Sequence, residues 1–492
     1  MRPRVFLFLW LGLGILLPAG SLMAQRRQAP APGKDDGVVT ALLVSDIHFD
    51  PFHDPEKAKL LDRAPANEWA AILQNADSVN GAQALASLQK SCRAKGVDTP
   101  YPLLRASLDA MRSREATPGF VTVTGDLIAH QFTCRYQTLF PGSSQQSYET
   151  FVEKTIQFVV EQLRGQFPGT PVYVTLGNND SDCGDYRLDA GGSFLSKTAQ
   201  LVAESVPAES RQDVLREFPA GGYYSVAMEP LRRTRVIVLN DIFWSPKYQT
   251  CTGAKDATPA KAELDWLGHQ LAAARKGGER VWVMGHIPPG VNTYSTVTKL
   301  IDVCANEPAE MFLNSDRLDD LLTRYADVVR LGLFAHTHMD EMRVIGPDGT
   351  HGGFTGGAAA AHEVAVKMVS SVSPVDGNNP SFTVARVDRA TAVLKDYAVV
   401  VASDFAGSAW REEYDFATTY HAASYSPETV EQLITGFRAD RKAQQTASQE
   451  YIRHYFKGDA VRELAPFWGQ YACSLDELSA RGYASCICAA NK

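Results

Sequence analysis

The chain has 492 residues, of which 45% are hydrophobic and 21% charged, and its formal net charge is −8 at pH 7. This is the composition of a globular protein that is long enough for a large core and a smaller attached domain. The chain has no long run of lysine and arginine, which argues against a nucleic-acid-binding surface. Any phosphate that it binds is therefore expected at a local site.

Residues 1–24 have the pattern of a secretory signal peptide. Two arginines precede an apolar run at 5–17, and small residues lead to a cleavage point after Ala24. The alternative is an uncleaved membrane anchor, because the apolar run is near the lower limit for crossing a bilayer. Residues 25–37 are polar and rich in proline, and are predicted to be a disordered tether. We expect a secreted or periplasmic protein with no membrane span in its mature chain.

Short apolar runs rich in valine recur along the chain and end in turn residues, as buried strands do. The runs lie at 38–46, 119–126, 171–180, 235–241, 279–286 and 328–338. Amphipathic helical patterns occur between some of them, at 101–114 and 262–278. The sequence therefore predicts an α/β fold in which helices cover the strands.

The last part of the chain changes character. Residues 381–401 are predicted to form a closing pair of strands. Residues 426–458 begin with serine and proline, which are typical of a helix N-cap and first position, and continue as one amphipathic helix. We therefore predict an α/β domain at 38–402 and a helical subdomain at 403–492.

Eight cysteines in a chain that we expect to be exported favour disulfides. Zinc ligation is the alternative, but the chain has no Cys-x-x-Cys pair. The sequence allows four bridges and does not pair them. We expect some of the last three cysteines to hold the helical subdomain together. The cysteines are Cys92, Cys134, Cys183, Cys251, Cys304, Cys473, Cys486 and Cys488.

Polar residues that could bind metal stand where the apolar runs stop. They are Asp46, His48, Asp126, Asn178, His286, His336 and His338. Each alone is explained equally well by a solvated turn, since Gly-Asp and Gly-Asn are common turn dipeptides. Strand ends on one edge of a sheet converge, however, so their recurrence at this position favours a single site.

The residue types fit a metal centre. Imidazoles, carboxylates and an amide oxygen, without cysteine, are ligands for Zn²⁺, Mn²⁺ or Fe²⁺. Seven ligands are too many for one catalytic ion that keeps a position open. We therefore predict two divalent ions that share one carboxylate.

The order and the residues of these motifs resemble those of the calcineurin-like metallophosphoesterases, and more closely those of their acid sphingomyelinase-like phosphodiesterase branch. The motifs are SDIHFD, TGDLIAH, LGNND, RVIVLND, VMGHIPPG and HTHMDE. The resemblance runs from about residue 40 to the end of the chain. It implies a four-layer α-β-β-α sandwich with a C-terminal helical subdomain.

The resemblance also implies a role for each residue. It divides the ligands into two sets that share Asp126: Asp46, His48 and His338 for one ion, and Asn178, His286 and His336 for the other. Zn²⁺ is the first choice, with Mn²⁺ or Fe²⁺ as alternatives. The expected reaction is hydrolysis by a metal-bridged hydroxide. The expected substrates are phosphodiesters or phosphoanhydrides, either small molecules or lipid headgroups.

Two positions depart from the family pattern. Ala335 replaces the glycine of Gly-His-Thr-His, and Asn179 replaces the histidine of Gly-Asn-His-Asp/Glu. An amide cannot deliver a proton, but it can donate a hydrogen bond to a phosphoryl oxygen. His130, four residues after Asp126, is expected to protonate the leaving group instead, as the resemblance implies for this position. The alternative is that His130 only orients a metal ligand.

The leading hypothesis is an exported, monomeric, dinuclear-metal phosphodiesterase. The alternatives are a phosphomonoesterase or endopolyphosphatase on the same scaffold, and a metal-stabilised binding protein without turnover. The complete ligand set favours an enzyme. The substrate cannot be read from the sequence; residues 52–93 form a polar insertion after the first strand, where loops shape access, and His53 on it is a candidate for lining the pocket.

Overall fold

The computed structural model describes residues 37–314, 317–347, 363–458 and 464–489. The predicted signal peptide and nearly all of the tether lie outside these residues. No helix in the described ranges has both the length and the apolar character needed to cross a membrane.

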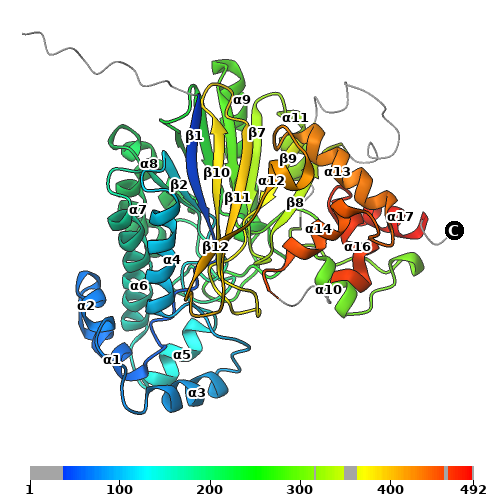
Figure 1. Cartoon of the computed structure of the whole chain (residues 1–492). Helices are drawn as coiled ribbons and strands as arrows, with labels where there is room; N and C mark the ends of the chain where they lie inside the picture. The colour runs from blue at the N-terminus through cyan, green and yellow to red at the C-terminus, as the bar shows by residue number, and fades with distance from the viewer. Residues whose placement is uncertain (1–36, 315–316, 348–362, 459–463, 490–492) are drawn as a thin grey trace, which may run out of the picture. The chain divides into compact units, whose positions relative to one another are not determined.

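Two six-stranded sheets form the centre of the described chain (Figure 1). In the first sheet, from one edge to the other, the strands are β12 (Trp410–Asp415), β11 (Leu394–Ala402), β10 (Ser381–Asp388), β1 (Val38–Val44), β2 (Phe120–Val123) and β3 (Val172–Val174). In the second they are β4 (Tyr224–Ala227), β5 (Thr234–Val238), β6 (Arg280–Met284), β7 (Val329–Phe334), β9 (Val364–Met368) and β8 (Glu341–Ile345). Every predicted run contains a strand, and the predicted closing pair is β10 and β11.

The inner faces of the two sheets share one hydrophobic core. The ring of Phe120 on β2 packs edge-on against Trp282 on β6, with centroids 5.6 Å apart. The Trp282 indole N–H donates to the carbonyl of Ala392, between β10 and β11, at 2.8 Å. Valine-rich strands suit this arrangement, because a strand buried on both faces carries no polar alternation.

Helices cover the outer face of each sheet, which confirms the four-layer sandwich. On the first sheet they include α4 (Tyr101–Arg114) and α7 (Ser193–Ser205), with α6 (Gln145–Gln166) packed against both. On the second they include α8 (Arg211–Gly221), α9 (Thr258–Gly277) and α11 (Arg317–Arg324). The bounds of α4 are those predicted. Helix α9 begins four residues earlier than its apolar pattern, because Pro259 favours the first turn of a helix.

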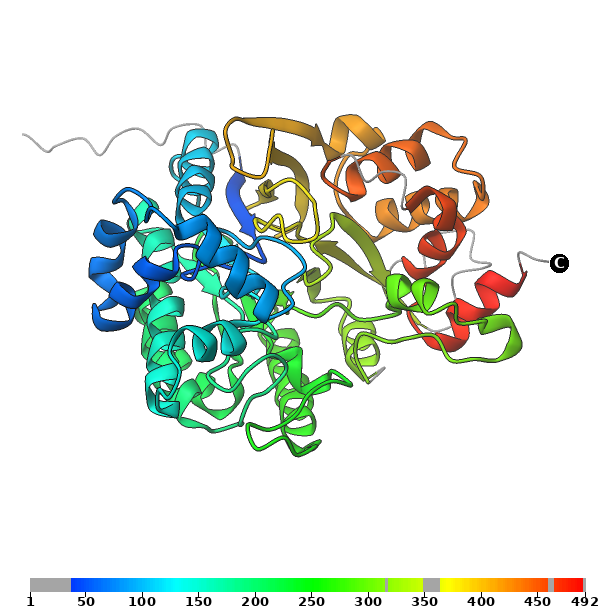
Figure 2. The same ribbon diagram turned by 90° about the horizontal axis from the view of Figure 1, so that it is seen from below.

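The predicted polar insertion is not a simple loop. It folds into α1 (Pro55–Arg63), α2 (Trp69–Leu73) and α3 (Gly81–Ser91), followed further along by α5 (Phe132–Leu139). Asp54 begins α1 by accepting hydrogen bonds from the backbone N–H groups of Glu56 and Lys57. Trp69 anchors the insertion, since its ring lies 5.4 Å from that of Phe151 on α6. Figure 2 shows these blue helices on one side of the strands and the C-terminal helices on the other.

The C-terminal region is helical, as predicted, but in more pieces. Its helices are α12 (Phe416–Tyr420), α13 (Pro427–Ala439), α14 (Thr446–Tyr455), α16 (Trp468–Ser474) and α17 (Ala480–Ala489), and α10 (Thr293–Thr298) packs beside α16. Ser426 caps α13 as expected, accepting from Thr429 N–H at 3.3 Å. The prediction of one helix at 426–458 was wrong, because the Asp440 carboxylate accepts from the backbone N–H groups of Gln444 and Gln445 and turns the chain. Strand β12 also extends the first sheet beyond residue 402.

All eight cysteines are paired, which confirms the disulfide framework. The bridges are Cys92–Cys134, Cys183–Cys251, Cys304–Cys488 and Cys473–Cys486. Two of them involve the last three cysteines, and one of these ties α17 to the segment that follows α10.

Candidate metal centre

The seven predicted ligands all follow strands. Asp46 and His48 follow β1, Asp126 follows β2, Asn178 follows β3, His286 follows β6, and His336 and His338 follow β7. Strands β1–β3 are parallel to one another, and so are β5–β7. Their carboxyl ends therefore meet at one edge of each sheet, and the structure brings all seven residues together there.

Unusual backbone conformations aim these side chains. Asp46, His48, Asp126, His336 and His338 all have positive φ, between 43° and 71°. Residues other than glycine rarely adopt this left-handed region, and such strain concentrates at functional sites.

Two glycines allow the strand ends to approach closely. A Cβ on Gly125 would lie 2.8 Å from His286 Nδ1, and one on Gly177 would lie 2.1 Å from Asp126 Oδ1. The glycines of the Gly-Asp and Gly-Asn motifs are therefore required by packing at the site. Ala335, where the family has glycine, is fully buried and is not among the residues with positive φ, so its methyl group is accommodated.

The donor atoms form two clusters. In the first, His338 Nε2 lies 3.3 Å from Asp46 Oδ1 and 3.2 Å from His48 Nε2. In the second, His286 Nε2 lies 3.1 Å from Asn178 Oδ1 and 3.3 Å from His336 Nδ1. Each cluster therefore gathers two imidazole nitrogens and one side-chain oxygen.

One oxygen belongs to both clusters. Asp126 Oδ2 lies 3.4 Å from His48 Nε2 and 3.3 Å from His286 Nε2. This is the geometry of a carboxylate that could be shared between two ions.

The residues fit divalent metals. Both carboxylate oxygens of Asp46 are buried and accept no hydrogen bond in the described chain. Each cluster also places two imidazole nitrogens within 3.3 Å of each other, an arrangement that a cation between them would stabilise. Nitrogen and oxygen donors without thiolates suit Zn²⁺, Mn²⁺ or Fe²⁺.

The electrostatics of the centre favour bound cations. Burial alone would raise the pKa of Asp126, but His286 and His48 hold it well below its usual value. Burial alone would lower the pKa of His286, but the nearby Asp126 carboxylate raises it to about 10, so the ring holds a proton that a bound ion would displace. Burial lowers the pKa of His48 to about 4 and that of His336 to about 3, which keeps these rings neutral, the form that binds metal.

A second ring nitrogen of each histidine is held by another residue. The partners are the Ile128 carbonyl for His48 at 3.0 Å, the Thr124 carbonyl for His286 at 2.7 Å, the Tyr186 hydroxyl for His336 at 3.2 Å, and Asp376 Oδ2 for His338 at 3.1 Å. A carbonyl can only accept, so Nδ1 of His48 and of His286 donates, and Nε2 is the nitrogen that each ring turns toward its cluster.

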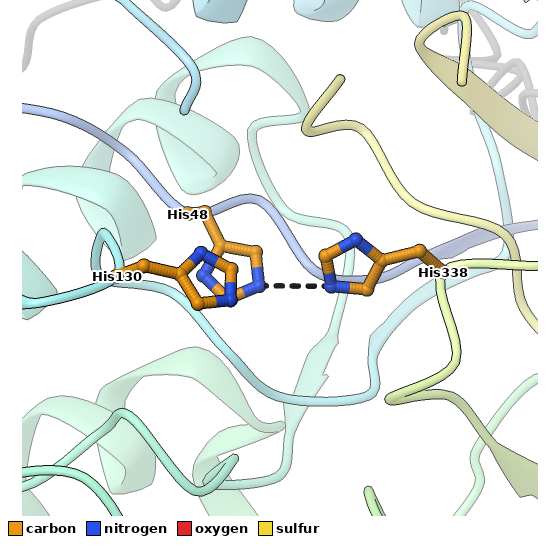
Figure 3. Close-up of side chains that lie close together, drawn as sticks. All are labelled: His48, His130 and His338. Atoms are coloured by element: carbon orange, nitrogen blue, oxygen red, sulfur yellow. Dashed lines mark hydrogen bonds between the residues drawn. The ribbon is translucent and has the colours of Figure 1, made fainter. Parts of the chain in front are cut away.

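His130 lies beside the first cluster (Figure 3). Its ring stacks on that of His48 with centroids 4.0 Å apart, and its Nδ1 lies 2.8 Å from Asp98 Oδ1. Asp98 is held in turn by the buried guanidinium of Arg135 at 3.2 Å. Burial alone would lower the pKa of His130, but Asp98 raises it above its ordinary value.

Asn179 is turned toward the shared carboxylate. Its side-chain amide donates to Asp126 Oδ2 and its backbone N–H to Asp126 Oδ1, both at 2.9 Å. In the structure this amide therefore holds the Asp126 carboxylate. The predicted hydrogen bond from the amide to a phosphoryl oxygen stays a prediction. His53 makes no hydrogen bond or ion pair with the seven residues in the described chain.

Several residues around the centre were missed by the sequence analysis. Asp180 accepts from the backbone N–H groups of Leu127 and Gly177, and Asp241 accepts from that of His286, each at 2.8 Å. Asp180 and Asp241 lie within the motifs LGNND and RVIVLND, so their position next to the ligands was a usable signal. Asp98, Asp376 and Tyr186 lie on loops that carry no such signal.

Comparison with known proteins decides the family. The family model of the calcineurin-like phosphoesterases matches residues 39–340, which is more than half of the chain. The chain belongs to this family. It is 30% identical over 252 residues to sphingomyelinase phosphodiesterase C of Dictyostelium discoideum, a match that covers 51% of this chain and 50% of that protein.

Other relatives place the chain in the acid sphingomyelinase-like branch. It is 25% identical over 413 residues to the mouse acid sphingomyelinase-like phosphodiesterase 3b, covering 79% of this chain and 80% of that one. It is also 29% identical over 256 residues to an endopolyphosphatase of Cryptococcus neoformans, covering 51% of this chain and 33% of that protein. The matched region thus spans from a third to four-fifths of these relatives' lengths.

Proposed function

We propose that the protein is a metal-dependent hydrolase that holds two divalent ions and cleaves phosphodiesters of small molecules or lipid headgroups. The observation that carries this proposal is the single oxygen, Asp126 Oδ2, within 3.4 Å of nitrogen donors from both clusters. Membership of the calcineurin-like phosphoesterases and the phosphodiesterase names of the relatives support hydrolysis of phosphoric esters.

Seven residues would hold the ions. Asp46, His48 and His338 would hold one, Asn178, His286 and His336 the other, and Asp126 both. When bound, such a pair of ions lowers the pKa of a water and clamps the phosphoryl oxygens for in-line attack. We assign Zn²⁺ first because imidazole dominates the donor set, with Mn²⁺ or Fe²⁺ as alternatives.

In this proposal His130 acts as the general acid. Asp98 holds its Nδ1 and the stack on His48 fixes its ring plane, so Nε2 is the nitrogen left to give a proton. The side chain is 27% exposed, whereas that of His338 across the cluster is 4% exposed, so His130 reaches solvent and an incoming ester. It would protonate the departing oxygen.

Asn179 supports the same reaction without transferring a proton. Its two hydrogen bonds to Asp126 fix both carboxylate oxygens, and the amide cannot protonate Asp126 as an acid could. The shared carboxylate therefore stays ionised and oriented for both clusters.

Export is part of the proposal. Four disulfides support folding in an oxidising compartment, such as the cell exterior or a periplasm. The proposed signal peptide lies outside the described residues.

An endopolyphosphatase activity is the second candidate, supported by the relative from Cryptococcus neoformans. Bis(p-nitrophenyl) phosphate, p-nitrophenyl phosphate and polyphosphate, assayed side by side with and without chelator, separate the candidates. We expect the diester to have the highest kcat/KM and chelation to abolish it. A preference for polyphosphate would support the second candidate, and no turnover of any substrate by metal-replete protein would contradict both.

A further inference from the structure

Asp376 differs from the other groups that hold the histidines of the centre. It lies on the loop between β9 and β10, and its side chain is 55% exposed although Oδ2 lies 3.1 Å from His338 Nδ1. Its other carboxylate oxygen has no hydrogen-bond partner in the described chain. Asp376 is therefore a charged group that faces solvent next to the metal centre.

The loop that carries Asp376 is fixed against the centre. The backbone N–H groups of Ser371 and Ser373 donate to the carbonyls of His338 and Asp46, at 3.3 and 3.0 Å. On its other side the loop packs so tightly on Gly96 that a Cβ there would lie 2.0 Å from the Val375 carbonyl oxygen. The position of Asp376 at the rim is therefore set by the backbone.

Holding His338 does not require a negative charge. His48 and His286 are held through Nδ1 by the neutral carbonyls of Ile128 and Thr124. Asp376 instead contacts His338 Nδ1 as an ion pair. Because its side chain is exposed, its charge also acts on whatever approaches the centre.

A positive charge lies near the second cluster. Lys247 is exposed, its Nζ lies 4.7 Å from the centre of the Tyr186 ring and 3.4 Å from its hydroxyl, and that hydroxyl contacts His336. Asp185, which is also exposed, accepts a hydrogen bond from the Asn178 amide at 2.7 Å, so charges of both signs lie beside the second cluster. An anion bound at the centre is attracted by Lys247 and repelled by Asp376.

We propose that Asp376 is a specificity-determining residue that disfavours doubly and more highly charged phosphates, and so selects singly charged phosphodiesters. This rests on the proposed function in that the two clusters are the place where phosphate binds. Each extra negative charge on the ligand raises the repulsion from Asp376, whereas a diester carries only one. One rim charge at roughly 8 Å in a largely aqueous setting changes the relative affinity about two- to fivefold per ligand charge.

Two non-hydrolysable ligands of matched shape test this. Phenylphosphonate is a dianion at pH 8, and its monomethyl ester is a monoanion. Their affinities are measured by calorimetry on the zinc-loaded protein and on Asp376→Asn, with metal content determined for each. Asn keeps an oxygen next to His338 Nδ1 while the charge is removed, and the metal content shows whether the orientation of His338 is kept. Asp109→Asn is the matched control, since Asp109 is 61% exposed on α4.

We expect Asp376→Asn to tighten the dianion about two- to fivefold relative to the monoanion, with the change fading at 1 M salt. Lys247→Met should shift the ratio in the opposite direction, and Asp109→Asn should leave it unchanged. An equal change for both ligands, no change, or loss of metal from Asp376→Asn would reduce Asp376 to a positioning residue and overturn the proposal. Absence of any hydrolysis would contradict the proposed function alone, because the affinity ratio is measured without turnover.

Discussion

Replacing His130 by alanine removes a proton donor and leaves the fold intact. The structure limits the stability cost, because Asp98 keeps its bonds from Arg135 and from the backbone N–H of residue 130 after the imidazole is lost. The lost imidazole bonded Oδ1 of the buried Asp98, and leaving that oxygen without this partner costs about 1–3 kcal/mol. The proposed metal ligands are untouched, since the contact between His130 and His48 is a ring stack. The loss should therefore appear in proton transfer.

General acid catalysis typically contributes about 10²–10⁴-fold. We expect His130→Ala to lower kcat/KM by that factor for alkyl phosphodiesters, whose alkoxide must be protonated as it leaves. Bis(p-nitrophenyl) phosphate should be spared, because p-nitrophenolate leaves without assistance. A series of diesters with leaving groups of increasing pKa measures this directly, together with metal content.

His269→Ala is the matched control, since His269 lies exposed on α9, away from the strand ends. The reasoning fails if His130→Ala loses equally on good and poor leaving groups. It also fails if the variant loses metal, which would make His130 a residue that only supports His48.

Two further predictions concern stability. Lys457 is fully buried between Asp340 and Glu413, 2.9 Å from each carboxylate. Lys457→Met should therefore lower the free energy of unfolding, measured by urea denaturation, by about 3–5 kcal/mol. The exposed Lys299→Met is the control, and a loss below about 1 kcal/mol, the level expected for that control, would contradict the prediction. Burial raises the pKa of Asp476 to about 7, so between its unfolded pKa near 4 and pH 7 the folded state binds more protons and its stability falls as pH rises. Asp476→Asn should make thermal stability depend less on pH in this window, and an unchanged slope would refute that assignment.

The central sheets could be predicted because buried parallel strands have a strong local signature. Valine-rich runs that end in a small residue followed by a polar one marked β1, β2, β3, β6 and β7 correctly. The insertion was harder to predict, since its helices are stabilised by contacts such as that between Trp69 and Phe151, which the local pattern does not contain. The break at Asp440 was missed because a side chain that caps the following turn does not interrupt the apolar periodicity.

The meeting of the seven proposed ligands could be predicted because each stands at a strand end, where topology alone brings side chains together. The residues that hold these side chains in place could not be predicted. Asp98, which holds His130, and Asp376, which holds His338, reach the centre from loops whose course depends on tertiary packing. The disulfide pairing could not be predicted either, since Cys304 and Cys488 are 184 residues apart and only the folded chain brings them together.

The shared oxygen of Asp126 is the central claim, and counting metal ions in three variants tests it most directly. Wild-type protein expressed with ample metal should contain about two ions per chain by elemental analysis. His338→Ala and His336→Ala should each lose the ion of one cluster and retain most of the other. Asp126→Asn should lose both, because an amide cannot bridge two cations as a carboxylate does. Asp126→Asn protein that still holds one full ion, or wild-type protein that holds less than one, would contradict the account.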